Sequence, residues 1–432
     1  MNQTLSISES KPLRLFMLFT LYISQGLPIG LFFYSIPAWL ANNGASVAEV
    51  GSFSFIIALP WTLKFVNGFF LDRYTYLPMG RRRVWLISAM LVMIISLLAM
   101  ALIDPLPTQL TLLSALSFAV MFATTFQDAA IDGMAADLVP EAEETISTGA
   151  MFGGQLIGIA LGSAVAGYLI AHTGFVSALY AMAALVGLIF LAALLTRERP
   201  GEKILPWTAG QASQEVQAVQ ARNFKEIFLT VFRSIKGAES LKLIGIMLLT
   251  SMGFAFYTST MPNLASELAG WTTEDYSALS GNANLLAGFV CLFIFGFLAN
   301  KLGRKRFMII LITVQCALAA WALFDQSIWS TDTFVSSAGV SVILIKYGLS
   351  VATAAIAMQL CDIKVSATQF TLYMACSNLG LSIAYAIVGS LDEKGGFTAL
   401  IMAFGVVYAL ALLVAVTLKG NGKNENVQNI ES

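Results

Sequence analysis

The sequence has few of the residues on which enzymes usually depend. Only 11% of its 432 residues are charged, whereas a typical soluble domain has about 25%, and 57% are hydrophobic. It has one histidine, His172, and we find no nucleophile–base pair, no G-x-x-x-x-G-K-[ST] phosphate loop and no cluster of metal ligands. We therefore expect no catalytic residue, no metal site and no cofactor, and the protein is not predicted to be an enzyme.

Cysteine is also scarce, and it is not arranged for chemistry. None of the cysteines forms a C-x-x-C pair, and all four lie within apolar stretches: Cys291, Cys316, Cys361 and Cys376. Isolated cysteines in such stretches usually behave as small buried apolar residues. The formal net charge is −1, and we expect no nucleic-acid partner.

Long apolar runs, in contrast, are abundant. A helix needs about 20 apolar residues to cross the hydrocarbon core of a bilayer. Twelve runs are long enough: 13–41, 47–71, 84–103, 108–134, 147–171, 174–196, 239–264, 276–300, 306–324, 336–360, 367–391 and 396–418. They predict an all-α polytopic membrane protein with 12 transmembrane helices. The first run is too long for a cleavable signal and lacks a small-residue cleavage site, so we expect it to remain as a membrane helix.

The longest interruption, 197–238, divides these runs into six and six. Its second half places apolar residues at helical spacing beside basic ones: Phe224, Ile227, Phe228, Val231, Phe232 and Ile235 beside Lys225, Arg233 and Lys236. This pattern predicts a helix that lies on the membrane surface. We therefore expect an N-terminal six-helix bundle (1–196), a cytoplasmic linker with an interfacial helix (197–238), a C-terminal six-helix bundle (239–418) and a cytoplasmic tail (419–432).

The basic residues indicate the orientation of the chain. Of the 24 lysines and arginines, Lys64 and Lys346 fall within predicted spans and Lys394 falls in an exterior loop, while the other 21 lie in or beside loops on the side of the N-terminus. The opposite loops carry mostly acids. Since lysine and arginine accumulate on the cytoplasmic side of membrane proteins, both termini are predicted to be cytoplasmic.

A charged hairpin occurs twice. After the second span, Gly68-x-x-x-Asp72-Arg73 is followed by a short loop and by Gly80-Arg81-Arg82-Arg83, and after the eighth span residues 296–306 read GFLANKLGRKR. The recurrence in the same membrane context predicts two related halves. We interpret Arg81, Arg82 and Arg83 as topology determinants at the membrane surface, and we expect the gating role for Asp72 and Arg73.

Twelve spans and this repeated motif resemble the major facilitator superfamily, whose fold consists of two pseudo-symmetric six-helix bundles. A narrower resemblance, to the AmpG-type branch of muropeptide and acetyl-CoA transporters, rests on four short stretches: Leu59-Pro-Trp-Thr-Leu-Lys64-Phe, Asp72-Arg73-Tyr74, Gln127-Asp128-x-x-x-Asp132, and Thr368-Gln369-Phe370 with Ser377-Asn378-Leu379-Gly380. The chain lacks the two extra helices of typical muropeptide permeases. Its compact length is most similar to the siderophore permeases of the RhtX, FptX and YbtX type.

Charged residues in the second and fourth spans are the first candidates for function. A charge in the hydrocarbon core costs several kcal/mol unless it has a partner, water or a role in transport. Asp128 and Asp132 are four residues apart and share one face of a helix, so we expect Lys64 or Arg73 to pair with one of them. Two interpretations remain open: a fixed structural ion pair, or an aspartate that takes up and releases a proton when the pair opens.

Lys346 is the candidate for binding an anionic group. It lies near the middle of the predicted tenth span, where a lysine attracts a ligand anion or forms an internal ion pair. Asp362, at the inner end of the same span, is a candidate gating residue that could instead pair with Lys364 or cap a helix.

The first and seventh spans begin the two halves and are expected to face a central cavity. Each combines polar groups with prolines or glycines that are expected to interrupt the helix, and interrupted helices in corresponding positions point to a substrate site. The candidate substrate-binding residues are Tyr22 and Gln25 in the first span and Tyr257 and Asn263 in the seventh. Glycines along the fifth span, in contrast, are interpreted as packing residues.

The resemblance implies a bacterial inner-membrane transporter that works by alternating access. Our main hypothesis is the import of a siderophore or siderophore–metal complex, coupled to protons, by a monomer in the lipid bilayer. The alternatives are a permease for muropeptides or other amphiphilic conjugates, and a non-transporting membrane sensor with the same two-state scaffold.

Overall fold

The protein is almost entirely helical in a computed structural model that describes residues 6–45, 47–212, 214–218, 223–271 and 273–419. In the first half, the helices are α1 (Lys11–Gly30), α2 (Ile36–Asn42), α3 (Val47–Thr62), α4 (Lys64–Arg73), α5 (Arg83–Ile103), α6 (Leu110–Leu138), α7 (Glu144–Thr173) and α8 (Phe175–Leu195). In the second half they are α11 (Ala238–Ala269), α12 (Thr273–Val290), α13 (Gly296–Leu302), α14 (Arg304–Phe324), α15 (Asp332–Leu360) and α16 (Ser366–Thr417). Between them lie α9 (Gln214–Ala218) and α10 (Phe224–Ile235).

The twelve predicted spans are present. Within the described residues, 11 helical stretches are long and apolar enough to cross a membrane. The last of them, Ile363–Thr417, has 55 residues and is interrupted by non-helical backbone at Gly395 and Gly396, so it contains two spans. Gly396 has a φ of 54°, which favours glycine and allows the chain to turn between these two helices.

The chain divides into two compact units. Unit 1 consists of Met1–Pro140, Gly153–Val231 and Asp362–Thr371, and unit 2 of Glu141–Phe152, Phe232–Cys361 and Leu372–Ser432. The start of α7 thus belongs to unit 2, and the start of α16 belongs to unit 1. The domain boundaries predicted at 196 and 239 stay a prediction, and most of the predicted tail (420–432) lies outside the described residues.

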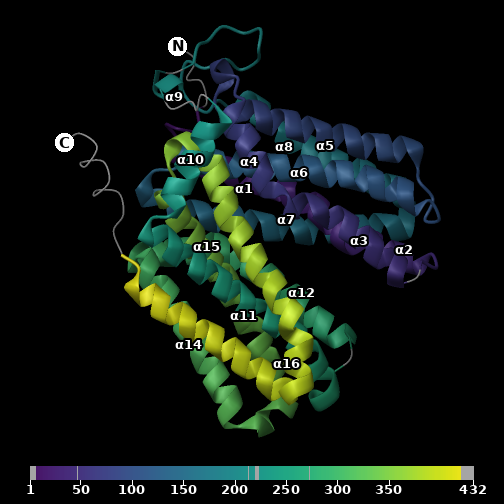
Figure 1. Cartoon of the computed structure of the whole chain (residues 1–432). Helices are drawn as coiled ribbons and strands as arrows, with labels where there is room; N and C mark the ends of the chain where they lie inside the picture. Colours follow the sequence, from purple (N-terminus) through teal and green to yellow (C-terminus); the bar gives the residue numbers. More distant parts are fainter. Residues whose placement is uncertain (1–5, 46, 213, 219–222, 272, 420–432) are drawn as a thin grey trace. The chain divides into compact units, whose positions relative to one another are not determined.

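In unit 1, α6 lies at the centre. It contacts α1, α3, α4 and α5, and α5 also packs against α8 (Figure 1). Two glycines of α7 lie directly against the backbone of α1. A Cβ atom at Gly158 would collide with Ile23, and a Cβ atom at Gly162 would collide with Leu27. Their interpretation as packing residues is confirmed for these positions.

In unit 2, α15 takes the position that α6 takes in unit 1. It contacts α11, α12 and α14. The helix α6 is the fourth span of its half and α15 is the fourth span of the other. This correspondence is what a repeat of two related halves requires.

Two spans contain π-helical turns, Leu31–Ser35 between α1 and α2 and Cys291–Phe295 between α12 and α13. Such turns insert one residue into the helical hydrogen-bond pattern and are frequent at functional sites. The predicted interruption of the first span is confirmed in this form. The seventh span was predicted to be interrupted in the same way, and this is wrong: α11 continues through Pro262, because a proline removes only one backbone hydrogen bond from a helix of 32 residues.

Candidate functional site

A buried cluster of polar side chains lies inside unit 1. Lys64 begins α4, directly after the irregular residue Leu63 (φ −90°, ψ 0°). Pro60 lies within α3, and the helix continues past it to Thr62, where it breaks before α4 begins. The break brings the lysine at the start of a new helix to the buried face of α6.

Lys64 is paired with two aspartates of α6, Asp128 and Asp132. Its Nζ forms an ion pair with Asp128 and lies 2.8 Å from Asp132 Oδ2. From α1, the Tyr22 hydroxyl donates to Asp132 Oδ1 at 2.5 Å, and the Gln25 amide donates to Asp128. All five side chains are buried. The prediction that Lys64 pairs with these aspartates is confirmed, and we call these five residues the Lys64 cluster.

The charges of the Lys64 cluster do not balance when all groups are ionised. One ammonium faces two carboxylates, so one negative charge is left in a site with little access to water. A single proton on either carboxylate would neutralise the cluster. Two carboxylates that share one site resist simultaneous ionisation, which makes this pair suited to bind and release a proton.

A second buried network lies at the end of α4. Asp72 Oδ1 lies 2.5 Å from Arg82 Nη2 and 3.3 Å from Arg81 Nη2. The Arg82 Nε also lies 3.0 Å from Asp137 Oδ2, at the end of α6, and its Nη1 donates to the Leu71 carbonyl at 3.0 Å. Both arginines are buried. Their charges are thus neutralised inside the protein by carboxylates on two helices, so the expected surface position is wrong, whereas a role as topology determinants stays a prediction.

The same network holds the start of α16. The backbone N–H and the hydroxyl of Thr368 both donate to Asp72 Oδ2, at 2.8 and 2.7 Å. Ser366 accepts from Arg82 Nη2 at 2.8 Å and donates to Asp137 Oδ1 at 2.5 Å. A carboxylate at the first turn of a helix is also favoured by the helix dipole. We call Asp72, Arg81, Arg82, Asp137, Ser366 and Thr368 the Asp72 network.

Unit 2 contains the counterpart at the second hairpin. Arg304, the first residue of α14, forms an ion pair with Glu144 at the start of α7 and donates to the Glu141 carbonyl at 2.7 Å. In each unit, therefore, an arginine of the repeated hairpin holds the start of a span from the other half of the sequence. The repeated sequence motif thus makes equivalent tertiary contacts in the two units.

Arg73 does not take part in the Asp72 network. Its guanidinium lies 5.2 Å from the ring centroid of Tyr74 in a cation–π contact, and the side chain is half-buried. The expected pairing of Arg73 with Asp128 or Asp132 is not seen, since Lys64 takes that position. A gating role for Arg73 stays a prediction.

The linker supplies a carboxylate to the backbone of all three hairpin arginines. Glu198, just after α8, accepts hydrogen bonds from the backbone N–H groups of Arg81, Arg82 and Arg83 at 2.8, 2.7 and 2.5 Å. Burial raises the pKa of the Glu198 carboxyl above its usual range. Burial and the neighbouring charge of Glu198 raise the pKa of Glu202 to about 7. The start of α5 is thus capped by a residue more than a hundred positions away in the sequence.

Lys346 in unit 2 lies among aromatic rings. Its Nζ is 3.7 Å from the ring centroid of Tyr347 and 5.4 Å from that of Phe254 on α11. Within the part of the chain that the structure describes, no carboxylate lies within ion-pair distance of this ammonium. The predicted alternative of an internal ion pair is therefore not found, whereas a role in binding an anion stays a prediction.

Two further candidates lie on α11. Tyr257 is buried, and its ring centroid lies 6.3 Å from that of Phe254, on which it stacks. Its hydroxyl oxygen lies 3.4 Å from the hydroxyl oxygen of Tyr276. The ring of Phe254 therefore contacts both Tyr257 and the ammonium of Lys346. Asn263 is exposed, and its substrate-binding role stays a prediction.

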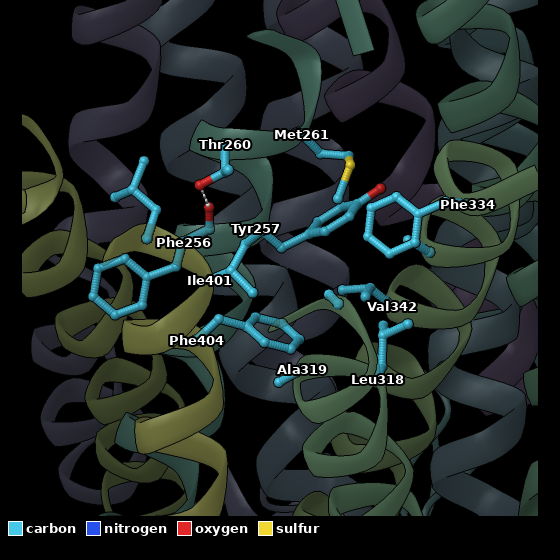
Figure 2. A pocket seen from close by; sticks show the side chains of 13 residues that line it. Phe256, Tyr257, Thr260, Met261, Leu318, Ala319, Phe334, Val342, Ile401 and Phe404 are labelled. Atoms are coloured by element: carbon cyan, nitrogen blue, oxygen red, sulfur yellow. Dashed lines mark hydrogen bonds between the residues drawn. The ribbon is translucent and has the colours of Figure 1, made fainter. Parts of the chain in front are cut away.

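Tyr257 also borders a small apolar cavity in unit 2, of about 30 Å³. Figure 2 shows it between the side chains of α11, α14, α15 and α16, with Phe256, Phe334 and Phe404 around it. Small-molecule sites usually have roughly 300–1,000 Å³. In this conformation the cavity is thus too small to hold a sugar or peptide, and the substrate-binding role of Tyr257 stays a prediction.

Asp362 caps a short turn. Its Oδ1 accepts from the Lys364 N–H at 2.8 Å, and its own N–H donates to Gln369 Oε1 at 2.8 Å. The capping alternative is confirmed, whereas gating by Asp362 stays a prediction. Among the described residues, no three His, Cys, Asp or Glu side chains are grouped so that they could hold a metal ion.

Twelve spanning helices in two related units, with buried ion pairs at the hairpins of both, define a polytopic membrane transporter. The sequence profile of the Major Facilitator Superfamily matches residues 18–291 and 243–431. The chain belongs to this superfamily.

Among curated proteins, the chain is 28% identical over 426 residues to the anhydromuropeptide permease of Escherichia coli strain K12, covering 95% of this chain and 81% of that protein. It is 26% identical to "Putative transporter AmpG 4" of Rickettsia felis, covering 93% and 95%. The resemblance to the AmpG-type branch is supported by both.

Two solved structures share the fold. A bacterial homologue of the iron transporter ferroportin, in an outward-facing state, has a TM-score of 0.67 at 12% identity and covers 94% of this chain and 98% of its own. The human organic anion transporter MFSD10 has a TM-score of 0.64 at 11% identity, with coverage of 93% and 98%. At these identities the likeness concerns the fold alone.

Several residues of these networks were not identified from the sequence. They are Asp137, Glu144, Glu198 and Ser366. One signal was available for Glu198: the predicted third span directly follows three arginines that cannot cap a helix, so its first N–H groups needed an acceptor from elsewhere. No local pattern identified the other three.

Proposed function

We propose that the protein is a proton-coupled permease of the bacterial inner membrane that imports muropeptide-type conjugates, in which a sugar is joined to a short peptide. Transport follows alternating access, with the Lys64 cluster as the proton site and Lys346 as a contact for an anionic group of the substrate. The termini lie in the cytoplasm, as the distribution of basic residues indicates.

The substrate class is supported by the likeness to the E. coli anhydromuropeptide permease, which extends over 95% of this chain. Muropeptides carry peptide carboxylates, and the half-buried ammonium of Lys346, which has no ion-pair partner among the described residues, is complementary to such a group. The siderophore hypothesis rested on compact length, and none of these relatives supports it. It is therefore replaced here by the muropeptide alternative.

One observation supports proton coupling above all others: Lys64 is paired with Asp128 and Asp132 together. With both carboxylates ionised the Lys64 cluster has one excess negative charge, and with one proton bound it is neutral. Proton binding therefore changes the electrostatic free energy of the bundle interior. A conformation that gives this cluster access to water favours the ionised form, and a closed conformation favours the protonated form.

The Asp72 network is the part of the protein that switches between two states during transport, one with its hydrogen bonds formed and one with them broken. It connects the ends of α4 and α6 to residues 366–368 through buried charged hydrogen bonds, which are strong but specific to one arrangement. When these bonds break, the start of α16 is released. The network thus favours the conformation in which it is complete.

Uptake by a strain without its own permease tests the proposal. The chain is expressed in an E. coli strain that lacks its anhydromuropeptide permease, and uptake of radiolabelled anhydromuropeptide is measured. We expect uptake to be restored and to decrease when a protonophore is added. Absence of uptake, with the protein present in the membrane fraction, would contradict the proposal.

Purified protein in lipid vesicles separates the remaining alternatives. A muropeptide flux driven by an imposed pH gradient is expected. Labelled ferric siderophores, offered in parallel, test the replaced hypothesis. A protein that moves none of these solutes would instead support the membrane-sensor alternative.

A further inference from the structure

The linker helix α10 (Phe224–Ile235) has three different edges. Ile227 and Val231 are buried, and they form the edge that faces the protein. Next to this edge is a row of exposed aromatic side chains, Phe224, Phe228 and Phe232, of which Phe228 is 57% exposed. The third edge carries the exposed basic residues Lys225, Arg233 and Lys236.

The aromatic edge continues onto the end of the second span. The ring centroid of Phe224 lies 6.1 Å from that of Phe70 and 5.8 Å from that of Tyr74. Phe70 and Tyr74 are themselves exposed, at 40% and 51%. The last turn of α4 and the first turn of α10 thus form one apolar surface.

Both ends of α10 are located at ends of membrane spans. Its first residue contacts Tyr74, which directly follows the last residue of the span Ser52–Arg73. Its last residue is followed after two residues by the span Ala238–Ala269. A helix of 12 residues between two such points lies near the level where the hydrocarbon core meets the lipid headgroups.

The basic edge is suited to anionic headgroups. Lys225, Arg233 and Lys236 outnumber the single acid of the helix, Glu226. The Lys236 ammonium lies 4.1 Å from the ring centroid of Phe232, so a cation is held directly beside the aromatic row. Aromatic side chains that enter the interface beside lysines and arginines are characteristic of helices that bind anionic membranes.

We propose that α10 forms a binding site for anionic phospholipids of the leaflet at which the linker lies. The rings of Phe224, Phe228 and Phe232 enter the interface beside Phe70 and Tyr74, and Lys225, Arg233 and Lys236 bind the phosphate groups of phosphatidylglycerol or cardiolipin. The linker between the two halves is thereby held at the membrane surface. This site is independent of the transported substrate.

Native mass spectrometry of the full-length protein tests the site. The detergent-purified protein is incubated with phosphatidylglycerol or with phosphatidylcholine, and the lipid that remains bound is counted. One lysine or arginine near an anionic surface changes lipid affinity by about fivefold. The variant Lys225→Gln/Arg233→Gln/Lys236→Gln is therefore expected to lose at least tenfold in affinity for phosphatidylglycerol, while retention of phosphatidylcholine is unchanged.

A matched control has the same loss of charge elsewhere. Lys11, Lys301 and Lys394 are exposed and lie outside α10, and their triple replacement by Gln is expected to retain phosphatidylglycerol as the wild type does. Equal losses in both triple variants would mean that lipid retention follows net charge, and would overturn the proposal. Wild-type retention by the α10 variant would overturn it as well. Thermal unfolding of each variant confirms that the fold is intact.

Discussion

Arg82 Nη2 lies 2.5 Å from Asp72 Oδ1, and both side chains are completely buried. The other oxygen of the same carboxylate accepts two hydrogen bonds from Thr368, at the start of α16. One aspartate therefore joins the hairpin after the second span to the beginning of the eleventh. A buried pair of this kind contributes little net stability, but removal of one partner leaves an uncompensated charge.

The first prediction concerns this aspartate. Asp72→Asn keeps the side-chain shape but removes the charge that faces Arg81 and Arg82, so we expect a loss of about 3 kcal/mol in stability of the closed conformation and at least a tenfold decrease in transport rate. Labelled-substrate uptake measures the rate, and the reactivity of cysteines introduced on the two sides of the membrane measures the conformation. Asp104→Asn is the control, because Asp104 is exposed at a loop position outside the network, and this variant is expected to transport normally. Wild-type transport by Asp72→Asn would show that the network does not control the conformational change.

The second prediction concerns proton coupling. Asp128→Asn leaves Lys64 paired with one carboxylate, so the Lys64 cluster is neutral without a bound proton. Uptake driven by a pH gradient is expected to fall at least tenfold, and its pH dependence between pH 5.5 and 8 is expected to disappear, while exchange of labelled for unlabelled substrate continues. Asp104→Asn, at an exposed loop position, is the control for the loss of one carboxylate. If the pH profile of Asp128→Asn matches that of the wild type, the cluster is a structural ion pair only.

The third prediction concerns Lys346. Replacement by alanine removes the ammonium that lies against the rings of Phe254 and Tyr347, so we expect the half-saturating concentration of an anionic substrate to rise about tenfold. Lys346→Arg is expected to retain part of the affinity, because it keeps the charge. Lys394→Ala is the control for the loss of one lysine. Unchanged concentration dependence in Lys346→Ala would exclude Lys346 from the substrate site.

The fourth prediction concerns pH and stability. The pKa of the Glu202 carboxyl rises from 4.5 to about 7 because of burial and the charge of Glu198, so the folded state binds this proton more tightly than the unfolded state does. The resulting stabilisation is complete below pH 4.5 and is lost as the pH rises through about 7. Glu202→Gln removes this contribution. The decrease in unfolding temperature of the detergent-purified protein from pH 5 to pH 8 is expected to be smaller in the variant, by on the order of 5 °C.

The pH series is compared between variant and wild type, because other carboxylates titrate in the same range. Glu141→Gln, at an exposed position of the 3₁₀ turn Glu141–Glu143, serves as the matched control. If the unfolding temperature depends on pH identically in Glu202→Gln and the wild type, protonation of Glu202 does not stabilise the folded state.

The membrane helices and one ionic contact could be predicted from local features of the sequence. Apolar runs of about 20 residues located twelve spans, because each segment that crosses a bilayer must be apolar in its own right. The spacing of Asp128 and Asp132 put both on one face of α6. Lys64 is the lysine within the second predicted span, so these two aspartates were its expected partners. The amphipathic pattern of 224–235 likewise predicted α10 at its observed position.

The roles of the arginines could not be predicted in the same way. From the sequence, Arg81 and Arg82 lie in a loop and Arg73 lies at the end of a span, so surface positions were expected for the first two and a gating contact for the third. In the structure the loop folds back, and Arg81 and Arg82 reach Asp72 and Asp137. Burial of a charge depends on partners that are distant in the sequence, and hydropathy along the chain contains no information about them.

Local composition was sufficient to establish that this chain is a twelve-span membrane protein with a repeated charged hairpin, since span length and basic-residue placement are set by the bilayer. Only folding in three dimensions determined which groups neutralise one another: Glu198 at the start of α5, Thr368 at Asp72, and Arg304 at Glu144. The physical reason is that the electrostatic free energy of a buried charge falls steeply with distance over a few ångströms, and those distances are created by helix packing.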